Sequence, residues 1–178
     1  MRSAQINKNC LYFLQQGSNN LLRWDMDTIE KDFKQGKVLA QNLVDFSVNE
    51  SGVVVTLTSE GLIRNLSTGA SYQCLPKYGP QFSAITILGD TVTVSGWKVN
   101  ETNSLIVINA SLIVHSMRAL SFGTGNDNWV RSIHCWYRRD GVQVLVVYPS
   151  SHVDLFRLKS NNTITAFNTY FQVSSIAV

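Results

Sequence analysis

Charged side chains are scarce in this 178-residue chain, at 15% of the residues, whereas about a quarter is usual in soluble domains. The 15 Lys and Arg against 12 Asp and Glu give a net charge of +3, which is too small to indicate nucleic acid or an anionic membrane as a partner. No run of about 18 apolar residues occurs, and this excludes a membrane-spanning helix. Ser, Thr and Asn fill the polar positions, a composition that favours strands and turns over helix surfaces.

Cysteine and proline are also few. The three prolines form no Pro-rich linker, and the cysteines, Cys10, Cys74 and Cys135, are odd in number and far apart. A disulfide framework would need more cysteines at closer spacing. Lys8 and Asn9 stand where a signal peptide would carry its apolar stretch. We therefore expect reduced thiols and a cytoplasmic protein, with the nucleus as the alternative.

The Asn-x-Ser/Thr sequence occurs repeatedly. In a chain rich in these three residue types, and without a predicted signal peptide, we interpret the matches as chance rather than as glycosylation sites. They begin at Asn49, Asn65, Asn100, Asn109 and Asn161.

Helical periodicity is nearly absent. The best helix candidate, Asp27 to Lys37, holds few apolar residues and has Gly36 near its end, which predicts a polar turn or one short helix. Short segments rich in Val, Ile, Thr and aromatic residues recur instead, bounded by Gly, Asn, Asp or Ser, and predict a β-sandwich, a barrel or a propeller. Examples are Cys10–Leu14, Val53–Leu57, Ala84–Leu88, Thr91–Ser95, Leu105–Ile108 and Val142–Tyr148.

A repeat decides among these three architectures. Four segments each begin with a small polar turn and continue as a strand that ends on a large apolar residue: Trp24, Leu66, Ile108 and Phe156. By subtraction, the intervals between them are 42, 42 and 48 residues, close to the 40–45 residues of a four-stranded propeller repeat. The polar stretch Gly123–Asn128 accounts for the longer third interval as a loop insertion.

A second feature recurs upstream of these turns. Leu43–Gly52 leads into the apolar run at Val53, and Val130–Gly141 leads into the run at Val142. Both segments are typical of a strand, a polar turn that closes on glycine, and a buried strand. A single four-stranded sheet cannot cover its own apolar face, so such units must stack on their neighbours.

These segments resemble the WD40 repeat, in which strands and Asp-Gly turns lead to a strand ending in Trp-Asp. Trp24-Asp25 matches literally and is followed by Asp27-Thr28, while Glu60-Gly61 followed by Thr68-Gly69 is a near match. The resemblance extends over nearly the whole chain. It implies an all-β propeller-like fold with about four four-stranded antiparallel blades, which could form part of a larger propeller. It also implies a role in binding other proteins.

The chain is expected to be a single WD40-like repeat domain, 1–178. Its predicted blades are approximately 1–40, 41–80, 81–122 and 123–170, with 171–178 closing or starting a blade. The chain is predicted to begin in a second strand, Cys10–Gln15, and to end in a first strand, Val173–Val178. Either the last segment completes the first blade and closes a ring of four, or the chain is a portion of a larger propeller with exposed sheet edges. We favour the second arrangement.

No residue pattern predicts catalysis, a metal or a cofactor. The three histidines, His115, His134 and His152, lie in different segments, and the adjacent His134 and Cys135 point to opposite faces of a strand. No Gly-x-Ser-x-Gly or Gly-rich phosphate loop is present, and the carboxylates lie mostly in predicted turns.

Four residues are candidates for binding another protein. In a WD40-like blade, the loops that enter the first strand and leave the second share one face of the disc. Trp97 and Tyr148 end predicted second strands, while Trp129 and Arg131 open a first strand, and these residue types are common in interaction hot spots. The alternative is that Trp97 and Tyr148 pack between blades.

Three functional hypotheses follow. The first is a non-enzymatic protein-interaction scaffold, which we favour. The second is a propeller that binds a small ligand or catalyses a reaction at its central channel, although no substrate is indicated. The third is a nucleic-acid-associated propeller, which would require one continuous basic face made by Lys77, Arg118, Arg131, Arg138 and Arg139.

Overall fold

The computed structural model consists almost entirely of short antiparallel strands. It describes residues 4–29, 36–74, 81–97, 104–111, 114–119, 130–148, 152–159 and 163–172. Sixteen strands form four sheets of four strands, and within each sheet the strands are hydrogen-bonded in the order of the sequence. The one helix in the described part of the chain is the single turn α1 (Met26–Ile29), in agreement with the polar turn or short helix that the sequence predicts there.

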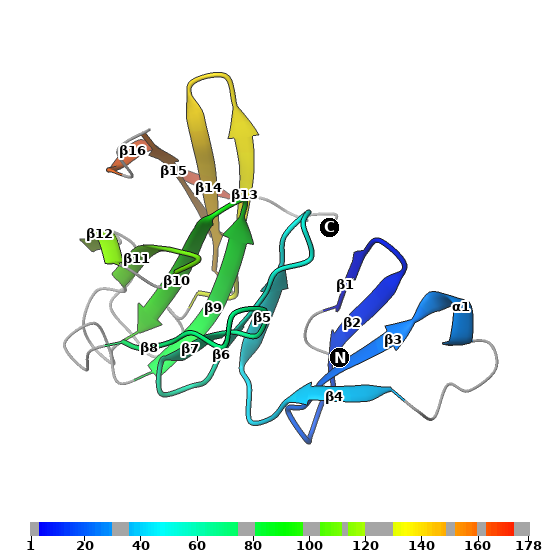
Figure 1. Ribbon diagram of the computed structural model, residues 1–178. Coiled ribbons are helices and arrows are strands. Elements are labelled where there is room, and N and C mark those ends of the chain that lie inside the picture. Colours follow the sequence, from blue (N-terminus) through cyan, green and yellow to red (C-terminus); the bar gives the residue numbers. More distant parts are fainter. Residues whose placement is uncertain are drawn as a thin grey trace.

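We call the four sheets blades 1 to 4 (Figure 1). Each begins with a strand on the inner side of the stack and ends with an outer strand. Blade 1 contains β1 (Ala4–Asn7), β2 (Cys10–Leu14), β3 (Leu21–Asp25) and β4 (Lys37–Ala40). Blade 2 contains β5 (Asp45–Val48), β6 (Val54–Leu57), β7 (Leu62–Asn65) and β8 (Ser71–Gln73). Blade 3 contains β9 (Gln81–Leu88), β10 (Thr91–Trp97), β11 (Ser104–Asn109) and β12 (Val114–Ala119). Blade 4 contains β13 (Ser132–Arg138), β14 (Gly141–Val147), β15 (His152–Leu158) and β16 (Ile164–Gln172).

The blades stack in the order of the sequence, with β1 against β5, β5 against β9 and β9 against β13. The arrangement is open, because β1 and β13 do not pack on one another as neighbouring first strands do (Figure 1). The predicted fold class is confirmed. The predicted last strand, Val173–Val178, lies outside the described residues.

The prediction that the chain begins in a second strand is wrong. A first strand, β1, precedes β2 and pairs with it from Ala4 opposite Phe13 to Asn7 opposite Cys10. Its sequence has no strong apolar alternation, because Gln5 and Asn7 use their side chains to hydrogen-bond the backbone of blade 2.

Each blade has two apolar faces, because successive side chains of a strand point to opposite sides. We call the face toward the following blade the front face and the face toward the preceding blade the back face. The neighbours Val54 and Val55 illustrate the rule: Val54 packs with Tyr12 and Leu14 of blade 1, while Val55 packs with Ile85 of blade 3. A third apolar cluster, which includes Leu105 and Val107 of blade 3 and Ile133, Val144 and Phe156 of blade 4, joins the last two blades.

The four residues that revealed the repeat lie on corresponding strands. Trp24, Ile108 and Phe156 belong to β3, β11 and β15, the third strands of their blades, and Leu66 follows β7 directly. Leu66, Ile108 and Phe156 are all on back faces, where they pack in the clusters shared with the preceding blade. The repeat therefore records one structural position, as the sequence predicts. No helix in the described ranges has the length and apolar character needed to cross a membrane.

Candidate functional site

Side chains of the first strands link consecutive blades by hydrogen bonds to backbone groups. Gln5 Oε1 accepts from Val48 N at 2.6 Å, and Asn7 Nδ2 donates to Asn49 O at 2.7 Å. The next junction repeats the pattern, since Asp45 Oδ2, Ser47 Oγ and Asn49 Nδ2 bond the backbone of Ile85, Ile87 and Gly89. These polar groups therefore have structural partners and are not arranged for chemistry.

The same strands line a groove of about 630 Å³ at the centre of the stack, bounded by residues of β1, β5, β9 and β13. The most chemically versatile side chain in it is His134, whose pKa is lowered by burial and whose Nε2 lies 3.0 Å from Ser132 Oγ. Cys135 points to the other face and packs against the core between blades 3 and 4, as the sequence predicts. The described residues contain no group of three or more His, Cys, Asp or Glu side chains placed to hold a metal ion.

The two buried asparagines of blade 2 have a structural role. Asn49 is 6% exposed and Asn65 is 2% exposed, although each begins an Asn-x-Ser sequence. The Nδ2 of Asn65 donates to Ala110 O of blade 3 at 3.0 Å, just as Asn49 donates to Gly89 O. An amide nitrogen that is buried and hydrogen-bonded cannot accept a glycan in the folded protein.

The structure describes the side chains of only two of the four residues predicted to bind another protein. Tyr148 is 1% exposed and donates from its hydroxyl to Asp154 Oδ2 at 2.9 Å, so in this structure it packs between blades, as the alternative interpretation holds. Arg131 is exposed at the same end of blade 4, where its backbone N–H donates to Val147 O at 2.8 Å. Trp97 ends β10, but its side chain and the whole of Trp129 lie outside the described residues.

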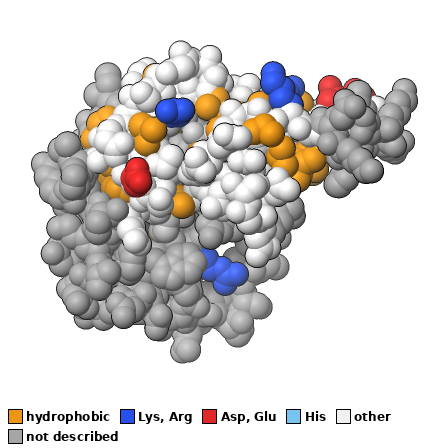
Figure 2. All heavy atoms as spheres, turned by 90° about the horizontal axis from the view of Figure 1, so that it is seen from below, with side chains coloured by type: hydrophobic (Ala, Val, Ile, Leu, Met, Phe, Trp, Pro, Cys, Tyr) orange, Lys and Arg blue, Asp and Glu red, His pale blue; other side chains and the backbone are white. Residues whose placement is uncertain are grey.

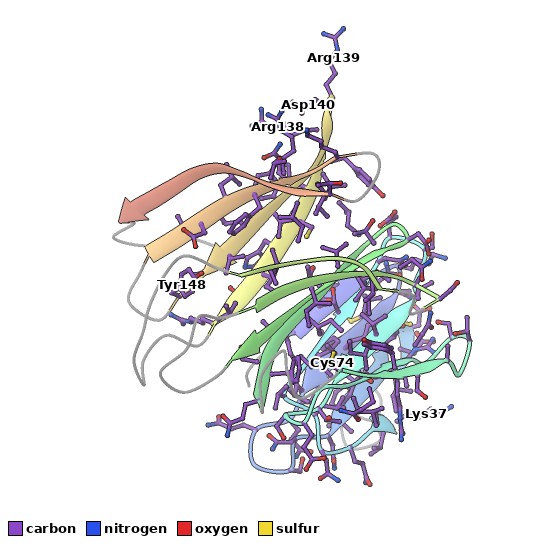
Figure 3. All side chains as sticks on the ribbon, turned by 90° about the vertical axis from the view of Figure 1, so that its left-hand side faces the viewer. Lys37, Cys74, Arg138, Arg139, Asp140 and Tyr148 are labelled. Atoms are coloured by element: carbon purple, nitrogen blue, oxygen red, sulfur yellow. The ribbon has the colours of Figure 1, made fainter. Side chains whose placement is uncertain are left out.

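The β13–β14 hairpin projects beyond the rest of the stack (Figures 1 and 3). Its tip carries Tyr137, which is 61% exposed, followed by the exposed Arg138 and Arg139. Asp140, next in sequence, is bound to Arg157 at 2.9 Å. In the part of the chain that the structure describes, no ion pair engages Arg138 or Arg139. The tip therefore presents an aromatic ring and two guanidinium groups to solvent.

Tyr137 also reaches toward the hairpin of blade 3. Its hydroxyl lies so close to Gly89 that a side chain there would overlap it. The ring is thereby held against a neighbouring blade at one end while most of it stays exposed, which limits the conformational entropy lost on binding. From the sequence, Arg138 and Arg139 are named only as members of a possible basic face, and Tyr137 is not among the candidate residues. The available signal was an aromatic-Arg-Arg run at the end of a long strand.

The basic residues of this set whose side chains the structure describes do not gather on one face. Arg131 precedes β13 and Arg138 ends it, so a strand of about 20 Å separates them. The side chains of Lys77 and Arg118 lie outside the described residues. Figure 2 shows the same sparseness from below, where single charged side chains stand among uncharged and hydrophobic surface. The three arginines that can be placed do not form the continuous basic face that the nucleic-acid hypothesis requires.

The cysteines differ sharply in their expected reactivity. Cys74 is 1% exposed, and burial raises the pKa of its thiol to about 12, whereas the half-buried Cys10 lies beside the Arg23 guanidinium at 3.0 Å. Because the thiolate is the reactive form, we expect iodoacetamide at pH 8 to modify Cys10 in the native protein and Cys74 only after denaturation. Peptide mass spectrometry measures both sites. Equal labelling of the two residues without denaturant would contradict this.

Comparison with known proteins reveals a match of fold alone. No protein-family model matches the chain, and neither does any curated protein. Among solved structures, the β-propeller domain of the Trilobed protease from Pyrococcus furiosus, described as having an open velcro topology, matches with a TM-score of 0.57 over 99% of this chain at 12% identity. The chain has a β-propeller fold. It spans 58% of that propeller domain.

Other solved structures match as well. The computationally designed Ika4 protein has a TM-score of 0.50 at 12% identity, over 88% of this chain and 89% of its own. The WD40 domain of SCAP from fission yeast is also among the matches, with a TM-score of 0.47 at 11% identity, over 93% of this chain and 44% of that domain. At these identities the comparisons establish the propeller architecture and assign no activity.

Proposed function

We propose that this propeller is a non-enzymatic scaffold for protein–protein interaction, and that the tip of the β13–β14 hairpin makes a principal contact. The observation that carries the proposal is the exposed Tyr137 beside Arg138 and Arg139 on a projecting hairpin. Tyr and Arg are among the residue types that contribute most binding energy at protein interfaces. The four stacked blades supply a packed base that holds the hairpin in place.

The chemistry of the tip favours a partner with an acidic surface. Two guanidinium groups can form bidentate hydrogen bonds with carboxylates, and the tyrosine ring adds apolar area at low entropic cost. The pairing of Asp140 with Arg157 leaves that carboxylate engaged on its own sheet, so the side presented by Arg138 and Arg139 is cationic. Arg131, at the other end of β13, remains a candidate for a second contact on the opposite side of the disc.

The test compares proteins that co-purify with the wild-type chain and with the triple variant Tyr137→Ala, Arg138→Ser, Arg139→Ser. Because these side chains are exposed, the variant should melt like the wild type, while its affinity for a captured partner should fall at least about tenfold. Binding should also weaken as salt rises. The matched control is Lys8→Ser in the corresponding β1–β2 hairpin, which removes a charge from another tip. A partner captured equally by wild type, triple variant and control would contradict the proposed hairpin contact.

A further inference from the structure

The open stack ends in two blade faces of opposite kind. Blade 1 has its front face packed on blade 2, and its back face looks away from the stack. Blade 4 has its back face packed on blade 3, and its front face looks away. In the part of the chain that the structure describes, no further blade packs on either of these two end faces.

The back face of blade 1 is apolar across all four strands. By cross-strand pairing it contains Ile6 opposite Leu11, Phe13 opposite Leu22, and Leu22 opposite Val38. Ile6 is 68% exposed and Val38 is 46% exposed on the two edge strands, whereas Leu22 and Trp24 between them are 9% and 7% exposed. Exposed apolar surface of this kind marks an interaction site. No charged residue of β1 to β4 lies on this face in that pairing, and depletion of charge is typical of an interface core.

The repeat indicates what this face is built to contact. Trp24 occupies on blade 1 the third-strand, back-face position at which Leu66, Ile108 and Phe156 pack on the preceding blade. Its ring is stacked on Phe13 at 4.1 Å and 7° and lies against Gly36 of its own chain, which leaves Trp24 7% exposed. The face therefore has the form of the receiving half of a blade junction.

The front face of blade 4 has the form of the other half. Leu145 pairs with Leu155 across β14 and β15, and both side chains are half-buried on this face. Leu155 precedes Phe156 as Val107 precedes Ile108 in blade 3, and Val107 packs on the following blade.

The first strand of blade 4 also carries polar side chains on its front face, as the first strands of blades 1 and 2 do. Ser132 and His134 stand on the front face of β13, as Gln5 and Ser47 stand on the front faces of β1 and β5. In blades 1 and 2, such groups bond the backbone of the next blade. On the same face of blade 4, the buried Gln143 Oε1 has no hydrogen-bond partner among the described residues.

We propose that two copies of this chain associate head to tail, the front face of blade 4 in each copy docking on the back face of blade 1 in the other. The two junctions are related by a twofold axis and continue the front-to-back order of the three junctions within the chain. The product is a closed ring of eight blades, inside the usual range of propellers. Closure matters because a front-to-back contact that did not close would extend into a filament.

The first experiment measures mass by size-exclusion chromatography with light scattering. We expect a dimer of twice the 19.9 kDa chain mass. The variants Ile6→Asp and Leu145→Asp each destroy one half of the junction and should be monomeric at concentrations at least about a hundredfold higher. A mixture of the two should regain dimers, because each variant retains the half that the other lacks. Ser71→Asp, exposed on the outer strand of blade 2, is the matched control and should leave the dimer intact.

Contact of the two faces can also be tested without introducing a charge. Ile6→Cys and His134→Cys proteins, mixed and oxidised, should yield an interchain disulfide between residues 6 and 134, identified by peptide mass spectrometry. This readout remains valid if Leu145→Asp fails to fold. A wild-type monomer, a dimer that survives Ile6→Asp, or disulfides that join 6 to 6 or 134 to 134 would overturn the head-to-tail pairing.

Discussion

The Asn49→Ala substitution is expected to lower the free energy of unfolding by about 2–4 kcal/mol. The Asn49 side chain is buried, and its Oδ1 accepts from Ser51 N at 3.0 Å and Val53 N at 2.8 Å, which closes the β5–β6 turn. Its Nδ2 donates to Gly89 O of blade 3 at 2.8 Å. Alanine removes all three bonds and leaves buried backbone groups without partners, a cost larger than that of the bonds themselves.

Urea denaturation followed by circular dichroism measures the loss. The matched control is Asn9→Ala, in the corresponding turn of blade 1, where the asparagine is exposed and the change should stay within about 0.5 kcal/mol. Asn65→Ala should resemble Asn49→Ala, because Asn65 closes its own turn and bonds Ala110 O in the same way. If Asn49→Ala and Asn9→Ala unfolded at the same urea concentration, the link between blades would contribute no stability.

The architecture could be predicted because it depends on spacing. Strand-length apolar segments at intervals of 42 residues require equal modules that cover one another. The position of Trp24, Leu66 and Ile108 on a third strand or directly after it follows from this. The third interval is longer in part because the β13–β14 hairpin is extended. In blade 4, Phe156 pairs with Val144, which lies three residues after Gly141, the first residue of β14. In blade 3, Ile108 pairs with Val92, which lies one residue after Thr91, the first residue of β10.

The junctions between blades could not be predicted from hydrophobicity. From the sequence, Gln5, Asn7 and Asn49 are expected on the surface, because polar side chains are usually solvated. Their partners are backbone groups about 40 residues away, at distances that only the assembled stack defines. For the same reason, the sequence of β1 lacks the apolar alternation that would predict a strand. The sequence also does not reveal that Asn49 and Asn65 link neighbouring blades.

The exposure of individual aromatic residues could not be predicted from the sequence either. Tyr148 and Tyr137 both follow apolar β segments, and only tertiary packing distinguishes them. The hydroxyl of Tyr148 is satisfied by the buried Asp154, which allows the ring to enter the core, while the extended hairpin carries Tyr137 out of it. Whether a tyrosine is buried or exposed therefore depends on the length of one hairpin, which the residue types do not reveal.

The Gly61→Ala substitution should destabilise the protein by about 2–5 kcal/mol, because two costs add at one position. Gly61 has a φ of 84°, in the left-handed region where a Cβ costs about 1–2 kcal/mol. A Cβ would also overlap the ring of Phe82, which is 3% exposed in the core between blades 2 and 3. Overpacking of this kind costs about 1–3 kcal/mol.

Gly69→Ala separates the two costs. Gly69 is in the next turn of the same blade with a φ of 75°, and no atom lies within 4 Å of its added Cβ, so only the backbone strain of about 1–2 kcal/mol should appear. The double variant Gly61→Ala, Phe82→Ala tests the source of the remainder. Because it removes the ring, the Gly61→Ala cost measured in the Phe82→Ala background should fall to that of Gly69→Ala. Urea denaturation measures the free energies of unfolding of the two single variants and the double variant. If the losses of the single variants simply added in the double variant, Gly61 and Phe82 would not be in contact, and the packing of blade 2 on blade 3 would differ from the structure.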